Sequence, residues 1–251
     1  MRRSGVLATA LVGVLVAWTS ATDARARHKA SPKCPPAGAH TIAADPQAQV
    51  FESAESTRLS GPYEPSEIFG CTYVHRRSYR LGGTPYIDKG GSGGVKEERL
   101  TGSIVAYVES YGGAVESGDC GGTRVYVRDL RNGRLLVNLP SGVKLQPNPL
   151  RLNPPHEGCE AVGVGEVRAI VVTSGGAVAW TAFDFRRDIV LLGTLPNASP
   201  PYPHYFDLYA ADKAGERLLA SGTEIDPDSL ALAGNTLYWT EGGKPLSAPV
   251  N

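Results

Sequence analysis

The sequence lacks an excess of charge of either sign. Lysine and arginine together number 25, aspartate and glutamate also number 25, and the formal net charge is zero. The basic residues form no continuous stripe along the chain, whereas a nucleic-acid-binding protein typically carries one. The sequence therefore predicts no nucleic-acid partner.

Long apolar runs are also scarce. The one extended uncharged run, Ser4–Thr22, follows a positively charged start and precedes small residues, which is typical of a secretory signal peptide. The run is too short to cross a bilayer comfortably and no second run exists, so we expect no membrane span after cleavage. Cleavage fits after Ala21 or after Ala26. We take residues 1–26 as the signal peptide, residues 27–38 as a flexible segment, and the destination as extracellular or the cell envelope.

Cysteine is sparse, and all four cysteines follow the leader: Cys34, Cys71, Cys120 and Cys159. In an oxidising compartment an even number of cysteines predicts disulfides, here two. Four cysteines allow three pairings. We favour Cys34 with Cys71 and Cys120 with Cys159, because each pair would join neighbouring segments.

Helical periodicity is almost absent, and short runs of β-branched and aromatic residues alternate with glycine, proline, asparagine and aspartate, as in strands and tight turns. One motif occurs three times without gaps: glycine, two residues, an aliphatic residue, a small or aromatic residue, then tyrosine or tryptophan. Its copies are Gly102–Val108, Gly175–Thr181 and Gly234–Thr240. Each copy predicts a strand, a turn at the glycine and a returning strand.

A second motif follows two of these copies. Residues Val125–Leu136 align without gaps to Leu208–Leu219, and each stretch predicts two strands around a turn marked by aspartate and glycine. A more diverged copy starts at Thr41. Together the motifs predict about three units of four antiparallel strands and a final hairpin, Ile225–Thr240.

Tandem four-stranded units resemble the blades of a β-propeller, in the broad group that includes TolB-like and WD40-like repeats of exported bacterial proteins. The resemblance covers residues 39–251 and implies an all-β, propeller-like repeat domain. Closed propellers have roughly four to eight blades, so we expect either that some blades have diverged beyond recognition, or that the propeller is partial, or that a second copy completes the ring as a homodimer. The alternative architecture is a β-sandwich.

One loop is unusually rich in rings. Between residues 200 and 206, prolines alternate with Tyr202, His204 and Tyr205. Aromatic loops on a rigid β scaffold commonly bind ligands, so these three residues are the candidate ligand-binding loop. The alternative is that Tyr205 and Phe206 enter the core and the prolines fix the turn.

Other candidates have plainer explanations. Ser92 lies between glycines without the helix that a nucleophile elbow needs, and outside the cell the thiols near His156 favour a disulfide over zinc. The acidic loop at Glu224, Asp226 and Asp228 lacks the glycine and length of a calcium motif. The clusters Arg76–Arg77 and Arg186–Arg187 fit solvated hairpin turns. We therefore assign no catalytic residue, metal ligand or cofactor.

These observations predict a secreted or cell-surface scaffold that binds a protein or glycan without catalysing a reaction. The alternative is an extracellular hydrolase or lyase that acts on glycans or peptides at the axial face of a propeller, a fold that hosts many activities.

Overall fold

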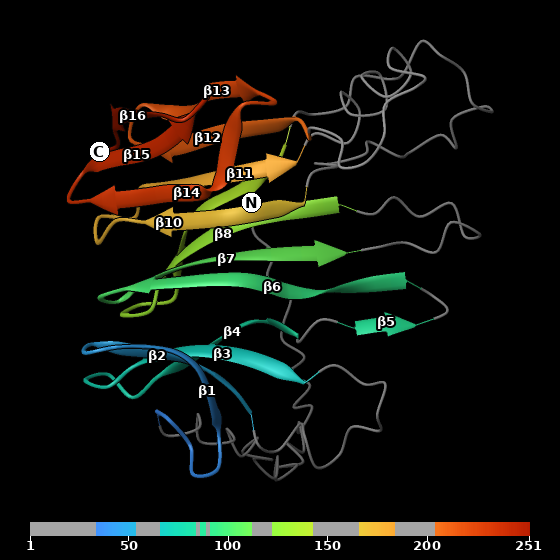
Figure 1. Ribbon diagram of the computed structural model, residues 1–251. Coiled ribbons are helices and arrows are strands. Elements are labelled where there is room, and N and C mark those ends of the chain that lie inside the picture. The colour runs from blue at the N-terminus through green and yellow to red at the C-terminus, as the bar shows by residue number, and fades with distance from the viewer. Residues whose placement is uncertain are drawn as a thin grey trace, which may run out of the picture. The chain divides into compact units, whose positions relative to one another are not determined.

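The chain folds into antiparallel sheets, and the described part contains strands and no helix (Figure 1). The computed structural model describes residues 34–53, 66–83, 86–88, 91–111, 122–142, 166–183 and 204–251. No helix long and apolar enough to cross a membrane occurs among these residues.

Each of the four sheets takes a contiguous stretch of sequence, and its strands lie in chain order. Sheet A contains β1 (His40–Asp45), β2 (Ala48–Glu52), β3 (Glu67–Thr72) and β4 (Ser78–Gly83). Sheet B contains β5 (Tyr86–Asp88), β6 (Gly91–Thr101), β7 (Ile104–Tyr111), β8 (Gly122–Asp129) and β9 (Arg134–Pro140). Sheet C contains β10 (Val167–Val172), β11 (Val178–Phe183), β12 (Phe206–Asp212) and β13 (Gly215–Gly222). Sheet D contains β14 (Ile225–Ala233), β15 (Thr236–Glu241) and β16 (Lys244–Pro249).

The repeated antiparallel unit expected from the sequence is confirmed, with two corrections. The motif glycines Gly102, Gly175 and Gly234 lie in the turns β6–β7, β10–β11 and β14–β15, as predicted. The final unit is not a hairpin, because β16 adds a third strand along β15. The second unit has a fifth strand, β5, at its other edge. The prolines of β16 and the glycines around β5 hid both strands from sequence reasoning.

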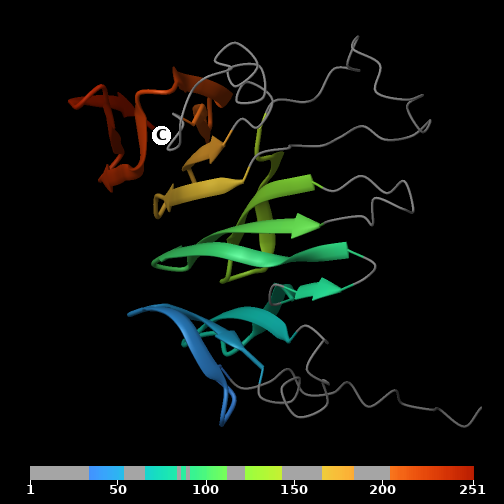
Figure 2. The same cartoon turned by 45° about the vertical axis from the view of Figure 1, so that its right-hand side comes forward.

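The sheets pack face to face in chain order (Figures 1 and 2). Three apolar clusters fill the contacts A–B, B–C and C–D. In β7, Ile104, Ala106 and Val108 face sheet C, while Val105 and Tyr107 face sheet A. The whole run is buried because successive side chains point to opposite faces and both faces are covered.

An aromatic pair recurs at the same place in three sheets. On the second and third long strands of each sheet, rings at directly opposite positions stack with centroids 5.1 to 5.8 Å apart. The pairs are Phe51–Phe69, Tyr107–Tyr126 and Trp180–Tyr209. In sheets B and C the pair faces the preceding sheet. In sheet D, Trp239 faces sheet C opposite Leu246.

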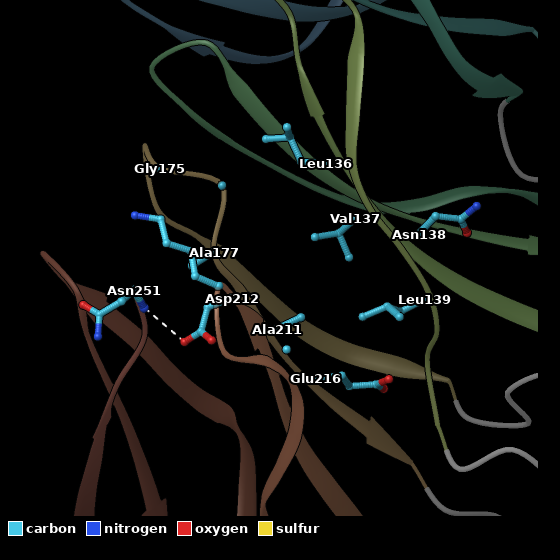
Figure 3. A pocket seen from close by; sticks show the side chains of 13 residues that line it. Leu136, Val137, Asn138, Leu139, Gly175, Ala177, Ala211, Asp212, Glu216 and Asn251 are labelled. Carbon is cyan, nitrogen blue, oxygen red and sulfur yellow. Dashed lines mark hydrogen bonds between the residues drawn. The ribbon is translucent and has the colours of Figure 1, made fainter.

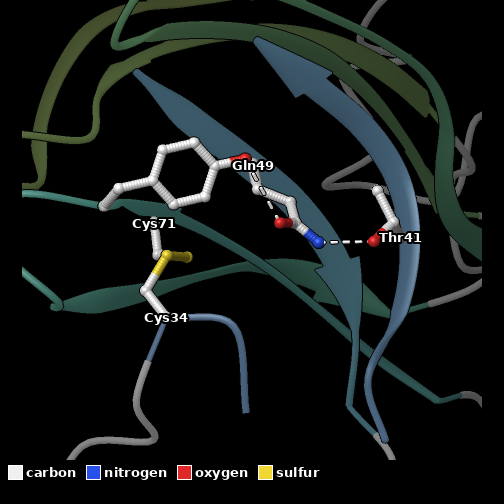
Figure 4. The surroundings of a disulfide bond; sticks show 5 residues. Cys34, Thr41, Gln49 and Cys71 are labelled. Atoms are coloured by element: carbon white, nitrogen blue, oxygen red, sulfur yellow. Dashed lines mark hydrogen bonds between the residues drawn. A yellow bond between two sulfur atoms is a disulfide. The ribbon is translucent and has the colours of Figure 1, made fainter. Parts of the chain in front are cut away.

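Among the described residues no sheet precedes sheet A, yet Phe51 is fully buried. Cys71 lies on the same face as Phe51 and Phe69, because Gln49 is its cross-strand partner. Cys71 is bonded to Cys34, which precedes β1 (Figure 4). On the same face, Gln49 bridges the hydroxyls of Thr41 and Tyr73. The predicted Cys34–Cys71 disulfide is confirmed, and it caps the first sheet where a preceding sheet would pack.

The free edge of sheet D, along β16, is closed to further pairing. Val250 N–H donates to the Asn235 carbonyl across the β15–β16 pair (2.8 Å). In an antiparallel pair the direction of the backbone groups alternates, so those of residues 245, 247 and 249 point to the open edge. Pro245 and Pro249 take two of these three outward positions and offer no N–H donor. The Pro249 carbonyl accepts from Arg217 Nη2 at 2.7 Å. Edge prolines prevent strand addition.

Four sheets in series distinguish this architecture from the β-sandwich alternative. Neighbouring sheets contact each other through the first long strand of each, which is β1, β6, β10 or β14. The contacts are β1 with β6, β6 with β10 and β10 with β14. Within the described residues, no strand of sheet A packs extensively on a strand of sheet D. The arrangement is compatible with a partial β-propeller.

Removing the disulfide should destabilise the protein. The double variant Cys34→Ser/Cys71→Ala opens a loop with a sequence separation of 37, and the chain-entropy model expects a loss of about 3 to 4 kcal/mol in the free energy of unfolding. Urea denaturation under oxidising conditions measures it. A variant as stable as the wild type would show that the disulfide does not cap sheet A.

Candidate functional site

Most tight turns between the described strands lie at the same end of the sheets, and the hairpin β15–β16, which turns at Gly242 and Gly243, lies at the other. At one end, on the left in Figure 1, tight turns join β1–β2, β3–β4, β6–β7, β8–β9, β10–β11, β12–β13 and β14–β15. We call this the turn end, and the opposite one the loop end. Bonds between sheets keep the turns together: Thr101 Oγ1 of sheet B donates to the Val172 carbonyl of sheet C at 3.1 Å.

A pocket of about 420 Å³ opens at the turn end between sheets B and C (Figure 3). Its apolar lining comes from β9, the β10–β11 turn and β12: Leu136, Val137, Leu139, Gly175, Gly176, Ala177 and Ala211. Its polar lining comprises Asn138, Asp212, Lys213, Glu216 and Asn251. We call it the β9 pocket.

The β9 pocket runs along a strand edge. Four consecutive residues of β9, Leu136–Leu139, line it. Because successive side chains of a strand point to opposite faces, a hollow over one face would be lined by alternate residues. The pocket therefore follows the edge of β9 that pairs with no strand of its sheet.

Asp212 fixes one side of the pocket. Its carboxylate accepts hydrogen bonds from Arg217 Nη1 (2.8 Å), from Ala214 N–H (2.9 Å) and from Asn251 N–H (3.1 Å). The Asn251 carbonyl accepts in turn from Lys213 N–H at 3.1 Å. These bonds tie the β12–β13 turn to the segment after β16, so sheets C and D share one polar clamp.

The clamp controls the charge of Asp212. The Arg217 hydrogen bond, helped by the two backbone donors, lowers the pKa of Asp212 to about 2 despite its burial. A carboxyl group with this pKa stays ionised at neutral pH and is a poor proton donor. The pocket thus has a fixed negative charge that is already neutralised by an arginine.

Asp129 holds the matching position of the second motif and forms a similar turn. Its carboxylate accepts from the N–H two residues ahead, on Arg131, as Asp212 does from Ala214. Its arginine partner differs, because Arg131 Nη2 approaches it at 2.7 Å. The turns after the two aspartates differ in length. Four residues lie between the cross-strand partners Asp129 and Arg134, whereas two lie between the partners Asp212 and Gly215.

The predicted aromatic loop lies at the loop end, away from the pocket. His204 and Tyr205 precede β12, and Tyr202 lies outside the described residues. The His204 ring packs edge-on against Phe183 at 5.2 Å. The Ser221 and Tyr205 hydroxyls are 3.4 Å apart.

Beside this loop lies a buried carboxylate that sequence reasoning missed. Asp207 is 2% exposed and accepts from the Tyr209 hydroxyl at 3.1 Å and from Ser221 Oγ. Its hydroxyl partners donate hydrogen bonds to the buried carboxyl oxygens within the sheet. The signal was one acidic residue in the otherwise apolar run Phe206–Ala211.

The structure describes only some of the other candidate site residues that the sequence suggested. Asp226 forms a turn in which its carboxylate accepts from Asp228 N–H at 3.1 Å. Among the described residues, no three His, Cys, Asp or Glu side chains converge as a metal site. The remaining candidates lie outside the described residues: the side chain of Ser92 and residues Cys120, His156, Cys159, Arg186 and Arg187.

Comparison with known proteins adds no relative: no family model matches the chain, and no curated protein matches its sequence.

Replacing Arg217 with methionine should lower the free energy of unfolding by about 2 kcal/mol at neutral pH, because Asp212 loses its main partner. Asp212 has a depressed pKa, so its contribution is present above its unfolded pKa, near 3.8, and is lost as the pH falls through about 2. Denaturation at several pH values between neutral and 2 should show this loss in the wild type and not in Arg217→Met. Arg134→Met, the exposed counterpart in the second motif, is the control and should change stability little. Equal effects of the two variants would contradict the clamp.

Proposed function

We propose that the protein is a secreted or cell-surface binding protein, without catalytic activity of its own, that holds an apolar side chain of a protein ligand in the β9 pocket. The pocket carries this proposal. Its volume, about 420 Å³, lies within the range of roughly 300 to 1,000 Å³ typical of ligand sites.

The lining favours a peptide over a glycan. Apolar side chains gain about 25 cal/mol for each Å² removed from water, whereas sugar hydroxyls lose hydrogen bonds in such surroundings. The residues that line the pocket include no aromatic ring on which a sugar could stack. The open edge of β9 adds backbone groups that an extended peptide could pair with.

The chemistry of the pocket supports binding rather than catalysis. Asp212 is held ionised by Arg217, so it is a poor general acid. Secretion is supported by the signal-peptide pattern at the N-terminus and by the Cys34–Cys71 disulfide, because disulfides persist in oxidising compartments.

Selection of phage-displayed peptides tests the proposal. Peptides enriched on the wild type should carry an apolar side chain and should lose at least tenfold in affinity for Leu136→Asp, which puts a charge in the apolar lining. Leu218→Asp is the matched control, because Leu218 is similarly exposed, 48% against 37% for Leu136, and does not line the pocket. Calorimetric titration of the enriched peptides gives the affinities. Peptides that bind Leu136→Asp as well as the wild type would contradict the assignment.

A further inference from the structure

Charge is segregated between the two ends of the strands, although the chain as a whole is neutral. Among the described residues, the turn end carries the cations Arg76, Arg77, Arg99, Arg128, Arg131, Arg134, Lys213 and Arg217 and the carboxylates Asp45, Asp129, Asp212 and Glu216. At the loop end the carboxylates predominate: Glu52, Glu67, Glu109, Glu166, Asp207, Glu224, Asp226, Asp228 and Glu241, against Arg80, Arg124, Arg168 and Lys244. The turn end is therefore the positive end of the described structure.

Two turns from different sheets bring the arginines together. In the β8–β9 turn, Gly133 lies against the ring of Tyr79, which follows the β3–β4 turn. Leu130 of the same turn packs among the residues of sheet A. The Arg131 hydrogen bond is the main cause that lowers the pKa of the Asp129 carboxyl group, and His75 of the β3–β4 turn adds a smaller effect in the same direction. We call Tyr73–Arg77 with Arg131 and Arg134 the basic patch.

The positive charge of the basic patch is not cancelled locally. The nearby carboxylate, Asp129, is engaged by Arg131. Within the described part of the chain, Arg76, Arg77 and Arg134 form no ion pair, and all three are exposed. Arg76 also has φ 50°, a left-handed conformation that glycine or asparagine adopts at lower cost. A basic side chain is thus displayed on a backbone that does not favour it.

An apolar tip accompanies these charges. Val74 is 82% exposed, more than any other large hydrophobic residue described, and the adjacent Tyr73 is 37% exposed. Both belong to the same turn as Arg76 and Arg77. An apolar tip flanked by cations matches the boundary of an anionic bilayer, where the apolar group enters the headgroup region and the cations meet phosphates. An anionic glycan would gain nothing from Val74.

We propose that the basic patch docks the protein peripherally on an anionic lipid surface. The inference does not depend on the β9 pocket. Each basic residue near such a surface contributes about a fivefold gain in partitioning, and the effect is weakened by salt. The apolar tip supplies an additional, salt-insensitive share of the affinity.

Vesicle co-sedimentation of the full chain tests the docking. Partitioning onto phosphatidylcholine vesicles with about 30 mol% phosphatidylglycerol should exceed that onto pure phosphatidylcholine and should fall with salt. The variant Arg76→Asn/Arg77→Ser should lose about 30-fold in partitioning onto the anionic vesicles. Arg168→Ser, which removes an exposed arginine at the loop end, is the matched control and should lose little. The apolar N-terminal run, Ser4–Thr22, is the same in the wild type and in the variants. The difference in partitioning between them therefore reports on the basic patch alone.

Val74→Ser separates the apolar tip from the charges, because it removes the apolar side chain and leaves the net charge unchanged. It should weaken binding to anionic vesicles several-fold even at high salt, whereas Leu218→Ser, which alters an exposed leucine outside the patch, should not. Circular dichroism and melting temperature establish that each variant is folded. Anionic-vesicle binding that is equal for the wild type and both patch variants would overturn the proposal. So would binding to heparin without binding to anionic vesicles, which would identify the patch as a glycan site.

Discussion

A β-sheet has two faces, and the structure depends on covering both of them. Four sheets in series provide three interior contacts, and each contact is filled by a separate apolar cluster. Strands covered on both faces are buried along their whole length, as Ile104–Val108 of β7 shows. The recurring aromatic pair places two rings of sheet B and two of sheet C against the preceding sheet, where a ring contributes more buried area than any aliphatic residue.

In the part of the chain that the structure describes, the first and last sheets each have an outer face without a neighbouring sheet, and the two faces differ. On sheet A the aromatic pair Phe51–Phe69 is kept, and the segment bonded through Cys34 caps its side of the sheet. On sheet D the outer face carries small and polar side chains around Tyr238, as terminal repeats commonly do. Two prolines close the adjoining edge. These features favour an array that ends at sheet D over one that continues into a second copy.

The sequence allowed much of this fold to be predicted, because hairpins are local. The glycine motif located the turns at Gly102, Gly175 and Gly234, and cysteine spacing favoured the observed disulfide. The two Arg-Leu-Leu runs are identical in sequence, but they pair with their neighbouring strands in different registers. Arg134 lies opposite Asp129, whereas Arg217 lies opposite Ala210 and reaches back to Asp212. A two-residue difference in turn length decides which arginine joins the carboxylate.

The sites were harder to predict, because each joins segments far apart in sequence. The β9 pocket needs β9, the β10–β11 turn and Asn251 in one place, and only the packing of sheets B, C and D brings them there. The sequence around Arg76–Arg77 predicts an ordinary solvated turn, because it does not show that the β8–β9 turn of another sheet lies beside it. The aromatic loop, by contrast, was visible in sequence, but its described residues are engaged at the loop end with Phe183 and Ser221.

We infer that both outer sheets are finished within one chain. Sedimentation velocity of the oxidised protein at micromolar concentration measures whether a second copy covers either of them. Because Pro245 and Pro249 block the edge of sheet D and the disulfide segment caps sheet A, we expect one species with the mass of a single chain. A stable dimer under these conditions would contradict it and would show that a second copy covers an outer sheet.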